Sequence, residues 1–386
     1  MRLPWALLLV LVAAPAAVPA HAQQGVTDAE IVLGGSNSFS GPLAFTGEQL
    51  TKFGVDLAFK VVNGAGGIHG RKVRTIWYDD GYEPQEAVAN TKKLVEQDQV
   101  FAILAPQGSP PVVATLAYIE ANKVPLLFPY QSSPVTRGRR WMFQGMTVSD
   151  RSSKMMIDYL AGRRKYRKFA ALYQDDEYGK SFLGAFEKDL GRHGLKLVAA
   201  ESVKPGVTDV SAQVAKLQAV KPEVTFLVLV PGPAAQALKE RQKIGWTHTL
   251  MVSTGPLTDE RYLALAGDAA EGVEGLSLWP DPLTSDLPGV RLYREHMLRY
   301  FPRNEPNRYS LAGYFAGMLF TEAAKRAGRS LTRESLVAAL EGIKGWESGI
   351  LAPLTIGPDH ETQKRGFWVR VEKGRFKQLT EWLKSE

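Results

Sequence analysis

The sequence offers few residues that could carry catalysis or hold a metal, and their spacing supports neither. It has no cysteine, which excludes thiol nucleophiles, cysteine-bound zinc and iron–sulfur clusters. The segment Gly179-Lys180-Ser181 resembles the end of a phosphate-binding loop, but Gln174 stands where that motif requires glycine. No two histidines after residue 22 lie three or four positions apart, as a helical metal site requires. We therefore predict no catalytic residue, no metal and no cofactor.

Charged clusters could also do chemistry, and we interpret them as surface features. The acidic groups 79–80 and 175–177 could act as acid/base or metal carboxylates, but adjacent acids after a strand are more often exposed loop charges. The segment 163–168 is basic with one aromatic residue, which is typical of a solvated helix end. The sequence therefore predicts no nucleic-acid partner.

The remaining chemistry lies in polar loops that follow predicted strands. Residues 36–42, 105–110 and 129–134 carry hydroxyl and amide side chains, and the last two loops contain serine followed by proline. Ser109 as N-cap with Pro110 at the first helical position is a favourable helix start. Helix N-termini bind carboxylate or phosphate without a cationic side chain, although plain capping explains any single loop. Three such loops together favour an anion-binding site.

The elements that would position these loops alternate between strand and helix. Short apolar runs are followed by segments with apolar residues at helical spacing, in one series before residue 145 and a second after residue 165. This order predicts α/β lobes with parallel sheets and a site at the carboxyl ends of the strands. The predicted strands are 31–33, 73–78, 101–104, 125–128, 169–173, 195–200, 224–230 and 249–253. The predicted helices include 48–62, 84–98, 110–122, 209–219 and 233–244.

Composition and the first residues bear on class and location. The chain has 386 residues, 45% of them apolar, and a net charge of +7, which suits a globular protein of two lobes. Residues 1–22 combine Arg2, a leucine-rich centre and an Ala20-His21-Ala22 cleavage signal, as a secretory signal peptide does. Without a cysteine the mature N-terminus cannot be lipidated. We therefore expect export, signal cleavage and a soluble periplasmic protein.

Several motifs occur in the order seen in one known family. The motifs are FSGPLAFTG at 39–47, NGAGGIHGRK at 63–72, YDD at 78–80, VPLL at 124–127, YQDDEYG at 173–179, DVSAQ at 209–213 and LAGDAAEGV at 265–273. On these residues the chain resembles the leucine/isoleucine/valine-binding family of periplasmic binding proteins, which serve ABC importers, over nearly all of residues 25–380.

The resemblance implies the type I periplasmic binding protein fold, in which two Rossmann-like lobes joined by a three-segment hinge close on a ligand. It implies an N-terminal lobe of 25–146 plus 279–351 and a C-terminal lobe of 147–278 plus 352–386. The positions that hold the ligand carboxylate in the family match Ser109 in one loop, and Tyr130 or Gln131 and Ser132 in the next. Gln107 is a further ligand-binding candidate, and Tyr178 of the second lobe would lie over the ligand or donate its hydroxyl.

Two departures from the family pattern bear on the ligand. Thr254 stands where amino-acid binders have an acidic residue for the α-ammonium, although Asp259 or Glu260 could take that role. Thr46, with Phe45 beside it, replaces an aromatic residue of the first loop. Since an ammonium without a counter-charge is costly to bury, we hypothesise a carboxylate or amide ligand that need not carry an amino group. Aromatic residues, Trp279 among them, could line such a site.

The resemblance implies the extracytoplasmic solute-binding component of an ABC transporter of the branched-chain-amino-acid type. Its partners would be a small-molecule ligand and permease subunits, and the protein would be a monomer. Two alternatives stay open: a binding protein that reports a ligand to a signalling partner, and an α/β hydrolase. The second would need a nucleophile–base pair, and no motif supplies one.

Overall fold

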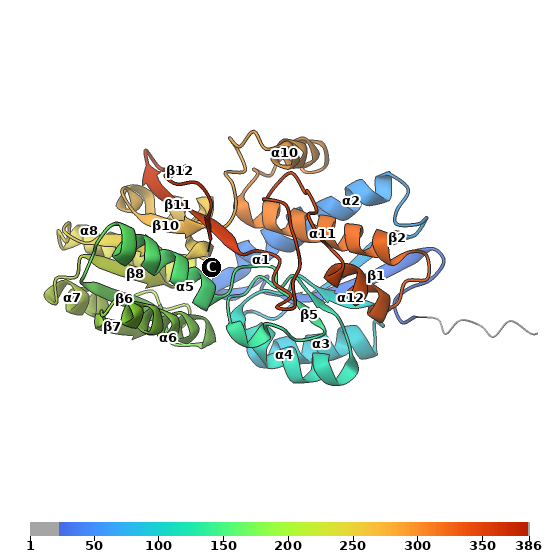
Figure 1. Cartoon of the computed structure of the whole chain (residues 1–386), viewed down its shortest axis with the longest axis horizontal. Helices are drawn as coiled ribbons and strands as arrows, with labels where there is room; N and C mark the ends of the chain where they lie inside the picture. The colour runs from blue at the N-terminus through green and yellow to red at the C-terminus, as the bar shows by residue number, and fades with distance from the viewer. Residues whose placement is uncertain (1–22, 385–386) are drawn as a thin grey trace, which may run out of the picture.

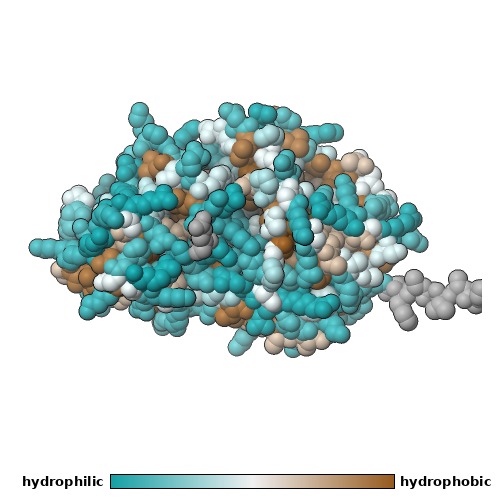
Figure 2. Space-filling view, in the orientation of Figure 1, coloured by the Kyte–Doolittle hydropathy of each residue, from teal (hydrophilic) through white to brown (hydrophobic). Residues whose placement is uncertain are grey.

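The computed structural model describes residues 23–384 and forms two lobes that lie side by side (Figure 1). The predicted signal peptide, residues 1–22, lies outside the described residues. Within them, no helix is long and apolar enough to cross a membrane. The face shown in Figure 2 is mainly hydrophilic, with apolar side chains scattered in small groups, so the large apolar clusters are interior.

The first lobe is built on a parallel sheet, as the alternation of strands and helices predicts. Its strand order is β2-β1-β3-β4-β5, so the chain starts in the middle and moves to both edges. Ile31 and Leu33 of the first strand are fully buried, because both faces of the sheet are covered by helices. The strands are β1 (Glu30–Asn37), β2 (Lys72–Asp79), β3 (Ala102–Leu104), β4 (Leu126–Leu127) and β5 (Met142–Phe143).

Helices from two parts of the chain cover this sheet (Figure 1). α3 (Pro84–Glu96) and α4 (Ser109–Asn122) pack together on one side, and α1 (Ala44–Leu50) and α2 (Asp56–Gly64) pack against α11 (Arg308–Ala327) on the other. The chain also returns to this lobe with α10 (Pro288–Tyr300) and α12 (Arg333–Glu341).

The helix predicted over 48–62 is interrupted by a π-helical turn, Thr51–Val55, between α1 and α2. Glycines make this region pack closely on α11: a β-carbon on Gly313 would lie 1.8 Å from the Leu50 carbonyl oxygen, and one on Gly54 2.6 Å from that of Ser310. Backbone therefore packs against backbone here.

The second lobe contains a mixed sheet, which corrects the expectation of parallel sheets throughout. Its order is β12-β11-β10-β9-β8-β6-β7; β11 pairs antiparallel with β10, β12 and β13, whereas the other pairs are parallel. The strands are β6 (Phe169–Gln174), β7 (Leu197–Val203), β8 (Val224–Val228), β9 (Leu250–Ser253), β10 (Glu274–Ser277), β11 (Arg365–Glu372), β12 (Arg375–Gln378) and β13 (Leu383–Lys384). The helices are α5 (Ser149–Ile157), α6 (Glu177–Arg192), α7 (Ser211–Ala219), α8 (Pro231–Lys243) and α9 (Glu260–Ala266).

Three segments connect the lobes: 144–148, 278–287 and 342–364. They lie side by side, because the Thr147 hydroxyl donates to the Gln363 carbonyl oxygen (3.2 Å) and the Gln363 amide donates to the Leu278 carbonyl oxygen. The predicted lobe boundaries fall within these segments and stay a prediction.

Candidate functional site

A small cavity lies between the lobes, at the carboxyl ends of the parallel strands. Side chains from both lobes line it, and its tyrosines and glutamines are almost fully buried. The lining residues are Leu43, Thr46, Tyr82, Gln107, Gly108, Ser109, Tyr130, Gln131, Ser132, Met146, Tyr178, Leu229, Val230, Pro231, Pro256 and Tyr309.

The structure brings seven of the nine site residues predicted from the sequence to this cavity. The loops after β3 and β4 are joined by a backbone bridge between Gln107 and Tyr130, and the amide of Gly108 donates to the Tyr130 carbonyl oxygen (3.0 Å). Two strand ends thus form one wall. The seven residues are Thr46, Gln107, Ser109, Tyr130, Gln131, Ser132 and Tyr178.

Ser109 is not the N-cap that the sequence predicts. α4 begins at Ser109 itself, after Gly108, and the Ser109 hydroxyl accepts the backbone N–H of Ser132 at 3.1 Å. A cap at Ser109 would need the N–H of residue 111 or 112; Pro111 has none, and the Val112 N–H donates to the Gly108 carbonyl oxygen at 3.1 Å. The hydroxyl of Ser109 and the amide of Ser132 therefore face each other where a carboxylate could bridge them.

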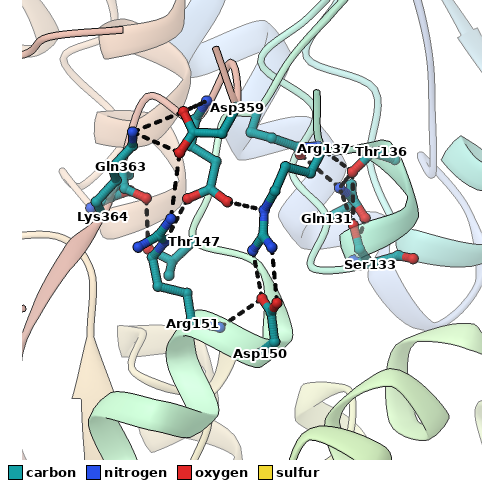
Figure 3. A network of polar contacts seen from close by, with 12 residues as sticks. Gln131, Ser133, Thr136, Arg137, Thr147, Asp150, Arg151, Asp359, Gln363 and Lys364 are labelled. Carbon is teal, nitrogen blue, oxygen red and sulfur yellow. Dashed lines mark hydrogen bonds and ion pairs between the residues drawn. The ribbon is translucent and has the colours of Figure 1, made fainter. Parts of the chain in front are cut away.

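The two glutamines of this wall differ in their partners. The Gln131 amide donates to Thr136 Oγ1 and Gln144 Oε1, both at 2.8 Å, and accepts the Ser133 N–H at 2.5 Å (Figure 3). Within the described chain, neither amide atom of the buried Gln107 has a hydrogen-bond partner. Gln131 therefore shapes the loop, and Gln107 is left unsatisfied.

On the opposite wall, Tyr178 stands in the first turn of α6. Its hydroxyl lies 2.6 Å from Thr254 Oγ1, which also contacts the Leu227 carbonyl oxygen at 3.3 Å. Burial raises the pKa of the Tyr178 phenol, so it stays neutral. Thr254 is fully buried behind Tyr178 and does not line the cavity, contrary to its predicted place in the site.

Two aromatic residues expected at the site also lie outside its lining. Phe45 packs edge-on against Tyr309 (6.5 Å between centroids), with Arg261 over its ring. Trp279 is buried against Phe315. In α1 the next position, Thr46, faces the cavity, because successive helical residues point about 100° apart.

The sequence reasoning missed Tyr82 and Tyr309, which complete the site. Tyr82 follows β2 in a left-handed conformation (φ 73°) and donates its hydroxyl to Asp176 of the second lobe at 3.1 Å. Tyr309 donates to the Pro256 carbonyl oxygen at 2.7 Å. Both contacts join the two lobes, so the cavity is closed in this structure. Tyr82 lies two residues after the YDD motif, and that position was the available signal.

No charged side chain is found among the described residues that line the cavity. Asp259 lies behind the wall, fully buried, with Oδ2 unpartnered and Oδ1 accepting the Arg261 N–H at 2.7 Å. Burial, and next the charge of Glu260, raise the pKa of Asp259 well above its usual range. Glu260 itself pairs with Arg308. Neither residue therefore supplies a free negative charge to the cavity.

Asp80, the residue that follows β2, has a structural role. Asp80 is buried and accepts hydrogen bonds from Ser36 Oγ (2.8 Å), Ser38 Oγ (2.9 Å) and the Tyr82 N–H (2.9 Å), so it is not the exposed loop charge that we expected. Within residues 23–384, no group of three or more histidine, aspartate or glutamate side chains could hold a metal ion.

Comparisons with known proteins agree with this geometry. A family model described as periplasmic binding protein matches residues 30–375. An amino acid binding protein of Pseudomonas aeruginosa is 30% identical over 250 residues, which are 64% of this chain and 66% of that protein. A Leu/Ile/Val-binding protein homologue of Brucella abortus is 26% identical over 354 residues, 90% and 93% of the two chains.

A solved structure extends the comparison to the whole fold. It is the fatty acid ABC transporter substrate-binding protein of Thermomonospora curvata, with a TM-score of 0.86, 24% identity, and coverage of 94% of this chain and 95% of that one. The chain belongs to the periplasmic binding protein family.

Proposed function

We propose that this protein captures a small carboxylate that lacks an α-ammonium group in the interlobe cavity and delivers it to an ABC permease from the periplasm. The observation that carries the proposal is the uncharged lining. A buried ammonium without a paired carboxylate costs several kcal/mol, whereas a carboxylate can be held by hydroxyls, amides and helix ends.

The positions of helix N-termini support a negatively charged ligand. Ser109, Tyr178 and Pro231 line the cavity, and they lie in the first turns of α4, α6 and α8. The positive ends of three helix dipoles thus point to one site, each contributing roughly 0.3–1 kcal/mol to anion binding. Ser109 Oγ and the Ser132 N–H would exchange their mutual bond for bonds to the carboxylate.

The similar Thermomonospora curvata protein is named for fatty acids, which carry a carboxylate and no ammonium. The amino acid binding relative of Pseudomonas aeruginosa shows that the family also accommodates ammonium-bearing ligands. The absence of a charged partner in the lining is what favours the first class for this chain.

The test is a pair of ligands that differ only in the ammonium group: L-leucine and 4-methylpentanoate. We expect calorimetric titration of the mature protein to show tighter binding of 4-methylpentanoate by at least tenfold. Ser109→Ala would weaken its binding about tenfold, because a hydrogen bond to a charged group contributes roughly 1.5–3 kcal/mol. Micromolar binding of leucine, with weaker binding of 4-methylpentanoate, would overturn the proposal.

A further inference from the structure

Gln107 presents an unusual combination of burial and unpaired polarity. Its side chain is 1% exposed and lines the cavity, yet neither Nε2 nor Oε1 has a partner among the described residues. A buried unsatisfied polar group costs roughly 1–3 kcal/mol, so such a residue needs a compensating role. The other cavity amide, Gln131, is fully hydrogen-bonded.

The surroundings of Gln107 leave room for its amide without supplying a bond. A β-carbon built on Gly47 would lie 2.9 Å from Gln107 Oε1, so the amide rests against the bare backbone of α1. Asn37, at the end of the neighbouring strand β1, is also fully buried, and neither of its amide atoms has a partner within residues 23–384. Two amides at adjacent strand ends therefore lack partners.

Three of the four tyrosine hydroxyls at the cavity are already engaged, in contrast to the Gln107 amide. Tyr82, Tyr178 and Tyr309 each bond to a protein oxygen, at 3.1, 2.6 and 2.7 Å. A ligand atom that meets these three tyrosines mainly contacts ring surface. A second polar group on the ligand finds its unsatisfied partner at Gln107, which can both donate and accept.

We infer that Gln107 is a specificity-determining residue, which selects carboxylates carrying a second, uncharged polar group such as a hydroxyl or an amide. The inference rests on the proposed function, because the carboxylate at Ser109 and Ser132 fixes the ligand's orientation. It adds that the part of the ligand away from the carboxylate carries a polar group and is not purely apolar.

Two matched ligand pairs test this inference by calorimetry. One is 4-methylpentanoate with 2-hydroxy-4-methylpentanoate, and the other is benzoate with 4-hydroxybenzoate, so the hydroxyl lies beside the carboxylate or at the far end. We expect the wild type to prefer the hydroxylated member of one pair about tenfold, and Gln107→Leu to reduce that preference to below threefold.

The outcomes separate the two claims. Binding of the acids without preference for a hydroxyl in either pair, or a preference that survives in Gln107→Leu, overturns the role of Gln107 and leaves the proposed function standing. Failure of every acid to bind overturns both.

Thermal unfolding of the ligand-free protein gives a readout that needs no ligand. We expect Gln107→Leu to keep or raise the melting temperature, because it removes an unpaired buried amide. Gln131→Leu is the matched control and should lower it, since it breaks a bonded network. A similar fall in both variants would show that the Gln107 amide is structural and would overturn the inference.

Discussion

Asp259 shows how one buried residue can bear on both stability and ligand choice. Its pKa is raised because it is buried and because Glu260 is adjacent, while Arg308 opposes the shift only weakly. The folded protein therefore holds a proton that the unfolded chain releases above its ordinary pKa of about 3.9. As the pH rises from the unfolded-state pKa to the folded-state pKa, the free energy of unfolding falls by about 1.4 kcal/mol for each pKa unit between them.

We predict that Asp259→Asn stabilises the protein at pH 7 by at least about 1 kcal/mol and has little effect near pH 3. The asparagine keeps the oxygen that caps α9 and carries no charge to bury. Urea unfolding at both pH values measures the difference. A variant that is less stable at pH 7 would show that Asp259 is ionised, and would revive its role as an ammonium partner.

The residue scale also shows how much of the site the sequence predicts. Ser109 and Ser132 line the cavity as the sequence predicts, because polar loops after parallel strands meet at one sheet edge. Phe45 lies outside the lining, and the sequence could not predict this because it does not tell which side of α1 faces the partner lobe. Tyr309 was missed because it enters the site from α11, after the chain has left the first lobe and returned.

At the scale of elements, the contact between α11 and the interrupted helix α1–α2 depends on glycine. Gly313 brings its backbone against Leu50, where a β-carbon would overlap the carbonyl oxygen at 1.8 Å. We predict that Gly313→Ala destabilises the protein by about 2 kcal/mol or more, because overpacking forces the two helices apart.

Gly184 provides the matched control for this prediction. It is an exposed residue inside α6, and its β-carbon would meet no atom within 4 Å. Gly184→Ala should stabilise the protein by up to about 1 kcal/mol through helix propensity. Chemical denaturation measures both variants; equal stability of wild type and Gly313→Ala would contradict the close packing.

Elements were predictable where the chain alternates regularly, and less so elsewhere. Strands β1, β6 and β9 match the predicted ranges to within a few residues, since buried parallel strands contain continuous apolar runs. The π-helical turn after α1 could not be predicted, because it depends on the helix that crosses it. The antiparallel strands β11–β13 lie beyond residue 253, where the predicted rhythm ends.

At the scale of the whole molecule, two buried carboxylates hold arginines in different settings. Glu361, in a connecting segment, is fully buried and accepts from Arg137 Nε and Arg151 Nε, both at 2.5 Å. Arg137 also pairs with Asp150, and Arg151 with Asp359, so the network joins the first lobe to α5 of the second (Figure 3). Burial opposes ionisation of Asp150, but Arg137 holds its pKa below the ordinary value.

Glu274 is the matching carboxylate inside one lobe. It is fully buried in β10 and pairs with Arg164 and, at 2.5 Å, with Arg370, and it accepts the indole N–H of Trp368 at 2.6 Å. Each of the two carboxylates forms ion pairs with two guanidinium groups. Only the Glu361 network connects elements of different lobes.

We predict that Glu361→Gln and Glu274→Gln each destabilise the protein by about 1.5–3 kcal/mol, because each removes the buried negative charge that two partly exposed arginines share. Glu361→Gln should in addition favour the open arrangement of the lobes, since Arg137 and Arg151 then repel each other across the connection. Small-angle X-ray scattering of the ligand-free variants measures this as a larger radius of gyration for Glu361→Gln and an unchanged one for Glu274→Gln. Equal scattering from both would mean that the network stabilises the fold without setting how the lobes close.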